Sequence, residues 1–189
     1  MGTGDRTQGA LPDADFALLC AFLDYLRSIS GPDGLPIKGD MDPVALAKMG
    51  ALASCWLVQR VDGDFVYRVA GDLIENAFGQ PLIGRRLSEV LDEETAVEIS
   101  RRWAHCLDNC SAYLNRGYVS APKGFRYSGV RVAVPLLDRA GDATYLLGLT
   151  LYKEVTKVLD GPIITSIQSD NLSYFSLADT DPRSLFRTE

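Results

Sequence analysis

The sequence contains a single histidine, His105, and this scarcity limits the chemistry that the chain can perform. One histidine cannot build a metal site with several imidazole ligands, and it leaves one candidate for a general base. The chain also lacks a Gly-x-Ser-x-Gly nucleophile motif, a phosphate-binding Gly-Lys-Ser/Thr loop and a His-Glu-x-x-His metal motif. Asp and Glu are plentiful, but no pair of them stands out. We therefore predict a protein that is not an enzyme and that holds no metal and no cofactor.

The sequence also has no cluster of Lys and Arg, and no apolar run approaches the ~18 residues of a membrane span. Its net charge of −6 argues against nonspecific binding to nucleic acid or to an anionic membrane, since both need a basic face. The N-terminus lacks the charged-then-apolar pattern of a secretory signal. We expect a cytoplasmic protein without a nucleic-acid or membrane partner.

The cysteines have neither the spacing of a zinc site nor that of a secreted disulfide framework. They are Cys20, Cys55, Cys106 and Cys110. We interpret all four as reduced thiols. Because Cys106 and Cys110 are four residues apart on a predicted helix, a redox pair at these positions is the alternative.

The most informative segment runs from Phe65 to Leu87. Large side chains alternate along 65–70 with a period of two, which predicts a strand that ends at Gly71. Asp72 is then expected to cap a short helix. The apolar residues that this helix should turn inward are Leu73, Ile74, Ala77 and Phe78. The turn that follows it is marked by Gly79, Pro81 and Gly84.

A strand, a short helix, a glycine turn and a second helix follow one another in this order in the N-terminal half of a PAS domain. With its flanks, the segment resembles a proteobacterial family of PAS-like proteins over roughly residues 16–153. The resemblance is carried by Leu35-Pro36, Asp40-Met41-Asp42-Pro43, Trp56-Leu57-Val58, Tyr67-Arg68-Val69-Ala70-Gly71, Phe78-Gly79, Leu82 with Gly84-Arg85, and Val134-Pro135-Leu136. It implies an α+β fold: a PAS-like five-stranded antiparallel sheet with short helices on one face, a long connecting helix and an N-terminal helical extension. It also implies a sensory or regulatory role, without a particular ligand.

We divide the chain into a disordered arm, a helical extension, the PAS core and a tail, at residues 1–12, 13–50, 51–153 and 154–189. In the core, the first two strands are expected on either side of a hairpin turn at 61–64. A long helix should follow Asp92. Three further strands are expected at about 115–121, 127–137 and 143–153. The apolar run 146–151 is typical of a central strand covered on both faces.

The helix predicted for residues 13–30 has apolar residues around about half of its circumference. A surface helix needs only a stripe of ~100° to pack on one core. The excess predicts a second contact, and we therefore expect a homodimer interface on this helix. Its candidate residues are Phe16, Leu19, Phe22, Leu23 and Leu26. The alternative is a wide stripe used wholly within one chain.

On the long helix, residues at steps of three and four predict one inward stripe. These residues are Ile99, Trp103, Cys106, Cys110 and Tyr113. His105 lies about 130° from the middle of that stripe at 100° per residue, so we expect it to face water. Some PAS sensors hold haem through a histidine on this helix, and the outward position of His105 argues against such a role here.

Two strand arginines, Arg68 and Arg131, are the sharpest candidates for ligand binding. An arginine is rarely buried without a partner, and one that faced the helix-covered side could clamp a carboxylate or phosphate bidentately. The alternatives are simple exposure or an ion pair with Asp72 or Glu75. The remaining pocket candidates are aromatic: Trp56, Tyr67, Phe78, Trp103 and Tyr113. Aromatic residues at these spacings can equally form the core.

The first functional hypothesis is a non-enzymatic sensory or regulatory PAS module that acts in signal transduction by dimerisation and contact with a protein partner. The 36 residues after position 153 are too few for an output domain, so a signal would leave by a noncovalent contact. The second hypothesis is a sensor with a small molecule in the PAS pocket. A third is an enzyme on a cone-shaped α+β fold. The spaced apolar patches of the tail predict either a docking element or a cover for the core's own apolar surface.

Overall fold

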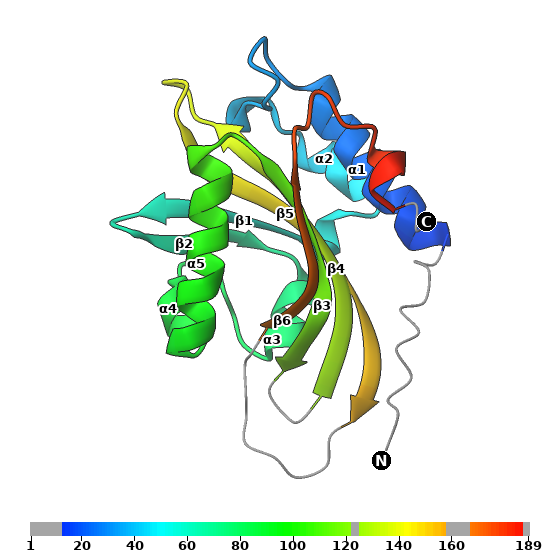
Figure 1. Ribbon diagram of the computed structural model, residues 1–189, viewed down its shortest axis with the longest axis vertical. Helices are drawn as coiled ribbons and strands as arrows, with labels where there is room; N and C mark the ends of the chain where they lie inside the picture. The colour runs from blue at the N-terminus through cyan, green and yellow to red at the C-terminus, as the bar shows by residue number, and fades with distance from the viewer. Residues whose placement is uncertain (1–12, 122–124, 158–166, 187–189) are drawn as a thin grey trace.

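The computed structural model describes residues 13–121, 125–157 and 167–186, and the predicted disordered arm lies outside these ranges. The predicted α+β class is confirmed, because helices pack against an antiparallel sheet (Figure 1). The strands are β1 (Cys55–Val61), β2 (Asp64–Ala70), β3 (Ala112–Ala121), β4 (Phe125–Leu137), β5 (Ala143–Lys157) and β6 (Ile167–Phe175). The α-helices are α1 (Asp13–Ser28), α2 (Pro43–Lys48), α3 (Asp72–Phe78), α4 (Leu87–Val90) and α5 (Glu93–Asp108). The 3₁₀ helices are η1 (Lys38–Asp40), η2 (Leu52–Ser54) and η3 (Pro182–Phe186).

The strand order across the sheet is β2-β1-β5-β4-β3-β6, and every neighbouring pair is antiparallel. The predicted hairpin between β1 and β2 is present: Asp62 and Gly63 both have positive φ, 52° and 80°, as a tight two-residue turn requires. The central position predicted for the apolar run 146–151 is confirmed as well, since β5 lies between β1 and β4.

Both faces of the sheet are covered. On one face, α3, α4 and α5 pack over the strands through residues such as Ile74, Leu87 and Trp103. On the other face, α1 and α2 cover the strands, and Val132 and Leu149 point into this second core. Alternating residues of β4 and β5 therefore enter two different cores, which explains why these strands are apolar at nearly every position.

Helix α1 uses its broad apolar arc within the chain, and this corrects the interface assigned to it. Four of the five candidate dimer residues are fully buried against the sheet and its neighbours: Leu19, Phe22, Leu23 and Leu26 are each 0% exposed. Phe16 is half-buried. The four side chains have no surface left for a second copy, so the intramolecular alternative accounts for the arc. The arc is wide because α1 shares one core with the sheet, with Leu46 of α2 and with Leu177 of the C-terminal segment.

The C-terminal segment joins the sheet, which therefore has six strands where five were expected. β5 continues to Lys157, and β6 pairs with β3 from Ala112↔Phe175 to Val119↔Ile167. Beyond β6, Leu177 is buried, and its carbonyl accepts a 2.7 Å hydrogen bond from Arg27 Nε of α1. Figure 1 shows η3, in red, beside α1, in blue. Residues 158–166 of the predicted tail lie outside the described residues.

The start of α3 differs from the prediction in one detail. Gly71, and not Asp72, occupies the N-cap, with extended φ/ψ of −75° and 158°. A Cβ at Gly71 would overlap the backbone of η2 at Ala53, so this close approach requires glycine. Leu73 was expected to face inward and is 54% exposed, whereas the other three predicted residues of α3 are buried. Gly79 ends α3 in the left-handed conformation, as predicted.

Candidate ligand pocket

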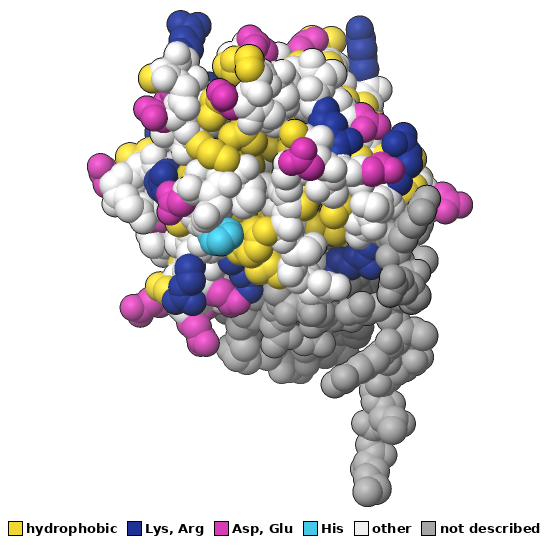
Figure 2. Space-filling view, turned by 45° about the horizontal axis from the view of Figure 1, so that its top comes forward, with side chains coloured by type: hydrophobic (Ala, Val, Ile, Leu, Met, Phe, Trp, Pro, Cys, Tyr) yellow, Lys and Arg dark blue, Asp and Glu magenta, His cyan; other side chains and the backbone are white. Residues whose placement is uncertain are grey.

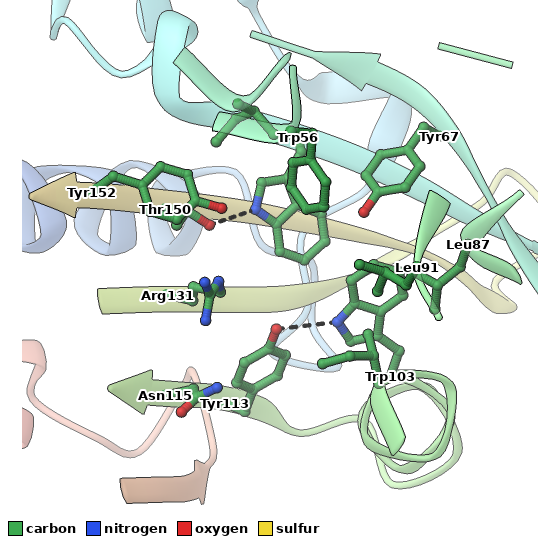
Figure 3. A pocket seen from close by; sticks show the side chains of 13 residues that line it. Trp56, Tyr67, Leu87, Leu91, Trp103, Tyr113, Asn115, Arg131, Thr150 and Tyr152 are labelled. Carbon is green, nitrogen blue, oxygen red and sulfur yellow. Dashed lines mark hydrogen bonds between the residues drawn. The ribbon is translucent and has the colours of Figure 1, made fainter. Parts of the chain in front are cut away.

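A small cavity of about 30 Å³ lies between the sheet and helices α3, α4 and α5 (Figure 3). Its apolar lining consists of Ile74, Phe78, Leu87, Leu91 and Ile99. Its aromatic and polar lining consists of Trp56, Tyr67, Trp103, Tyr113, Asn115, Arg131, Thr150 and Tyr152. A space of this size holds about two water molecules. The site is therefore small, with its polar groups on the sheet and its apolar groups mainly on the helices.

The polar floor of the cavity is a row across three adjacent strands. Asn115 of β3 pairs in register with Arg131 of β4, and Arg131 pairs with Thr150 of β5. Directly opposed residues in an antiparallel sheet have side chains on the same face, with Cβ atoms about 5 Å apart. Strand register thus places an amide, a guanidinium and a hydroxyl side by side under the helices.

The neighbouring row on the same face consists of Tyr113, Ala133, Gly148 and Trp56. The small residues in its middle leave room for the large residues at its ends. A Cβ at Gly148 would overlap the six-membered ring of Trp56, so the indole lies across the glycine. Glycine at this position lets the Trp56 ring reach over β5 toward Thr150.

Two indole–hydroxyl hydrogen bonds order the aromatic walls. Trp56 Nε1 donates to Thr150 Oγ1 at 2.9 Å, and Trp103 Nε1 donates to the Tyr113 hydroxyl at 3.1 Å (Figure 3). The two indoles stack with ring centroids 5.1 Å apart and an interplanar angle of 28°. Tyr67 meets the Trp103 ring edge-on at 6.2 Å. Both indole N–H groups are therefore satisfied inside the protein.

Arg131 is the exceptional residue of the site. It is only 5% exposed, and its guanidinium lies over the Tyr152 ring at 5.6 Å from the centroid. Neither Nη1 nor Nη2 has a hydrogen-bond acceptor among the described residues. A buried charge without such acceptors is costly, and buried arginines are normally paired.

The tyrosines around Arg131 do not supply the missing negative charge. Burial raises the pKa of Tyr67 and of Tyr113, and it outweighs the opposing influence of the Arg131 charge on each. Both side chains are consequently neutral phenols at physiological pH. The lining residues contain no Asp and no Glu. The positive charge of Arg131 thus has no counter-charge within the lining.

The structure brings six of the seven predicted pocket residues to the cavity: Trp56, Tyr67, Phe78, Trp103, Tyr113 and Arg131. Arg68 is not among them. It is exposed on β2, and its Nε donates to Gln59 Oε1 at 2.9 Å, so the expectation that it lines the pocket is corrected. Arg68 and Tyr67 are consecutive in a strand, so their side chains point to opposite faces of the sheet. Tyr67 points to the face covered by α3, α4 and α5.

Sequence reasoning missed Asn115, Thr150 and Tyr152. A signal for Thr150 was available, because it is the one polar residue in the apolar run 146–151. Asn115 offered a weaker signal as a polar residue in a predicted strand. Neither signal identifies Arg131 as a neighbour, because residues 115, 131 and 150 come together only through strand register.

His105 faces solvent, as predicted, and Figure 2 shows its imidazole in cyan on the surface. Its ring contacts Tyr174 of β6 at a centroid distance of 4.3 Å. His105 therefore points away from the cavity. Trp103, on the opposite side of α5, is the residue that lines it. In the described part of the chain, no three potential metal-ligating side chains come together.

The four cysteines are all unbridged. Burial raises the pKa of Cys55 and of Cys106 to about 12, so both remain thiols. The expected helical stripe stops short of Cys110, because α5 ends at Asp108 and Cys110 is exposed with a φ of 49°. Among the described helices, none is long and apolar enough to pass through a bilayer.

Comparison with known proteins agrees with this architecture. A family model for the PAS domain matches residues 17–151, well over half of the chain. The chain belongs to the PAS domain family. No curated protein matches it.

Solved structures resemble this PAS domain in fold. Vibrio cholerae VqmA, in a complex with a ligand and DNA, aligns with 13% identity and a TM-score of 0.48, over 60% of this chain and 52% of VqmA. This chain thus spans about half the length of VqmA. The LOV domain of a blue-light activated histidine kinase from Erythrobacter litoralis EL346 aligns with 19% identity and a TM-score of 0.43, over 54% of this chain and 96% of that domain. At these identities the likeness concerns the fold alone.

Proposed function

We propose that this PAS domain is a sensory or regulatory module that responds to a small molecule bound between the sheet and helices α3–α5. One observation carries the proposal: Arg131 is buried in the cavity, and its terminal nitrogens have no acceptor in the described structure. A buried guanidinium without acceptors destabilises the folded chain, and a ligand oxygen would remove that penalty. A few convergent polar groups in a largely apolar lining are a feature of ligand pockets.

Ligand binding would reach the surface through the helices. The cavity holds about two waters, so a larger molecule has to move side chains of α3 and α4 outward. Helix α3 carries one exposed large apolar residue, Leu73, whose position at the surface would shift with the helix. A ligand that binds only the displaced arrangement shifts the population toward it, which is how such a module would signal.

Dimerisation and contact with a protein partner remain predictions within this proposal. The core positions of α1 are buried, so a dimer would need another surface. Light scattering on wild-type protein tests for a dimer independently of any ligand.

Native mass spectrometry of protein purified without denaturation tests the proposed function. We expect a stoichiometric mass above that of the chain, released on denaturation, or a saturable thermal stabilisation by one fraction of a cell extract of small metabolites. Unfolded and refolded protein, stripped of ligand, is the control. The proposal is wrong if neither a bound mass nor a stabilising fraction is found.

A further inference from the structure

We infer that the ligand is a monocarboxylate with an apolar body, held through its carboxylate by Arg131 with help from the hydroxyls of Thr150 and Tyr113. This inference rests on the proposed function and specifies its ligand class. It follows from the charge of the lining, the direction of its hydrogen bonds and the position of its apolar residues.

The charge of the cavity selects a monoanion. Arg131 is the only Arg, Lys, Asp, Glu or His residue in the lining, and burial keeps Tyr67 and Tyr113 neutral. One carboxylate would neutralise one guanidinium. A phosphate dianion would leave a net negative charge in the same apolar surroundings, which is unfavourable. A neutral ligand would leave the positive charge of Arg131 uncompensated.

The hydroxyls of Thr150 and Tyr113 are arranged as hydrogen-bond donors to a ligand. Thr150 Oγ1 already accepts a proton from Trp56, and the Tyr113 hydroxyl accepts one from Trp103. Each hydroxyl therefore keeps its own proton for donation. Nη1 and Nη2 of Arg131 add a planar pair of donors, which matches the two oxygens of a carboxylate.

The apolar lining indicates the chemical nature of the rest of the ligand. Arg131 and Thr150 lie on the sheet, whereas Ile74 of α3 and Leu87 of α4 form part of the opposite wall. A carboxylate at Arg131 would thus direct its substituent toward the helices, where aliphatic and indole surfaces would surround it. A branched aliphatic or a single-ring aromatic substituent suits such a wall, and a second charged group does not.

The test uses three carboxylates and their neutral amides: isobutyrate, benzoate and phenylacetate against isobutyramide, benzamide and phenylacetamide. Phenyl phosphate serves as a dianion of similar shape. The sequence has only two tryptophans, and both line the cavity, so intrinsic fluorescence reports on this site alone. Each compound is titrated to roughly 10 mM, above the Kd of a weak ligand, and a thermal melt confirms each binding signal.

We expect at least one carboxylate to change the fluorescence saturably and to raise the melting temperature, while its amide and phenyl phosphate do neither. Arg131→Gln should weaken the binding of that carboxylate by roughly 100-fold, because charge-assisted hydrogen bonds are lost. Arg131→Lys should weaken this binding by about tenfold, since a lysine keeps the positive charge but lacks the planar guanidinium. The matched control is Arg68→Gln, which removes an exposed arginine outside the cavity and should bind like wild type.

The inference is overturned if no carboxylate binds, if an amide or phenyl phosphate binds as tightly as the acid, or if Arg131→Gln binds the acid unchanged. A neutral molecule found in the natively purified protein would overturn it while the proposed function stood. If the purified protein carried no bound molecule, charged or neutral, and no metabolite fraction stabilised it, the proposed function itself would be wrong.

Discussion

The indole of Trp56 lies across Gly148 of the neighbouring strand and donates a 2.9 Å hydrogen bond to Thr150, two residues further along. These two contacts fix the ring in one orientation. The same ring stacks on Trp103 of α5, so it joins the polar floor of the cavity to its helical wall. The geometry of the site therefore depends on the absence of a side chain at position 148.

Gly148→Ala is expected to lower the free energy of unfolding by about 1–3 kcal/mol, because the new methyl group overpacks the core. Trp56 has to leave its place over the strand, so its fluorescence spectrum should also change. Urea denaturation followed by fluorescence measures both effects. Gly39→Ala is the control, since no atom lies near its added Cβ. A variant with wild-type stability and spectrum would show that the ring does not need this glycine.

Arg131→Met should leave the ligand-free protein as stable as wild type, or stabilise it by up to about 1–3 kcal/mol. The substitution removes a buried charge whose terminal nitrogens have no acceptor in the described structure, and the methionine fills similar space. Arg102→Met is the control: Arg102 is also buried, at 9% exposed, but forms an ion pair with Glu98, so its replacement should bring no gain in stability. Urea denaturation of stripped protein is the measurement. A clear loss of stability in Arg131→Met would assign this arginine a structural role.

Leu177→Ala should destabilise the chain by about 2–5 kcal/mol, as expected for a buried leucine. Leu177 is 2% exposed and follows the strand that completes the sheet. This result would support the C-terminal segment as a cover for the core. Ser173→Ala, at an exposed position of β6, is the control and should stay within about 0.5 kcal/mol of wild type. If both variants melt like wild type, the segment contributes nothing to the fold.

Leu19→Glu and Leu26→Glu should each prevent stable folding, because each places a charge in the second core at a cost above about 4 kcal/mol. Circular dichroism and light scattering distinguish this from loss of a dimer. Ala21→Glu, on the exposed side of α1, should remain folded. A folded monomer from Leu19→Glu would restore the interface first predicted for this helix.

Asp138→Ala should reduce stability near neutral pH and lose this effect in acid. The Asp138 carboxylate accepts hydrogen bonds from the backbone N–H groups of Asp142 and Ala140 and from the Thr144 hydroxyl in the turn between β4 and β5. These bonds, that from Asp142 foremost, hold the pKa of Asp138 below its ordinary value of 3.8.

A depressed pKa means that the contribution of Asp138 is complete above the ordinary value and disappears as the pH falls through the folded-state value. The urea midpoints of wild type and Asp138→Ala should therefore differ fully near pH 7 and begin to converge only as the pH falls below about 4. Asp142→Ala, in the same turn, is the control for loss of a surface carboxylate. A difference that stays constant with pH would show that the carboxylate charge is not involved.

Local patterns in the sequence were enough to predict most elements and their faces. Alternation along Phe65–Ala70 predicted β2, and Asp62-Gly63 predicted the turn before it. Helical periodicity predicted that Trp103 faces the core and that His105 faces solvent. These features depend on residues close together in the chain, where backbone geometry sets which side chains share a face. The family resemblance rested on the same short-range motifs, and the family match confirms its PAS domain part.

Two outcomes depended on tertiary structure. The apolar arc of α1 is compatible with an intramolecular or an intermolecular contact, and only the packing of α1 on the sheet and the C-terminal segment distinguishes them. Arg68 and Arg131 look alike in sequence, yet one is exposed and the other is buried between two partners in register, Asn115 and Thr150. Periodicity predicted the strands that hold the two candidate arginines, and the resemblance to PAS-like proteins implied the α+β class. Strand register and helix packing decided which arginine is enclosed. Both bring together residues that are far apart in the chain, and local sequence patterns do not specify such contacts.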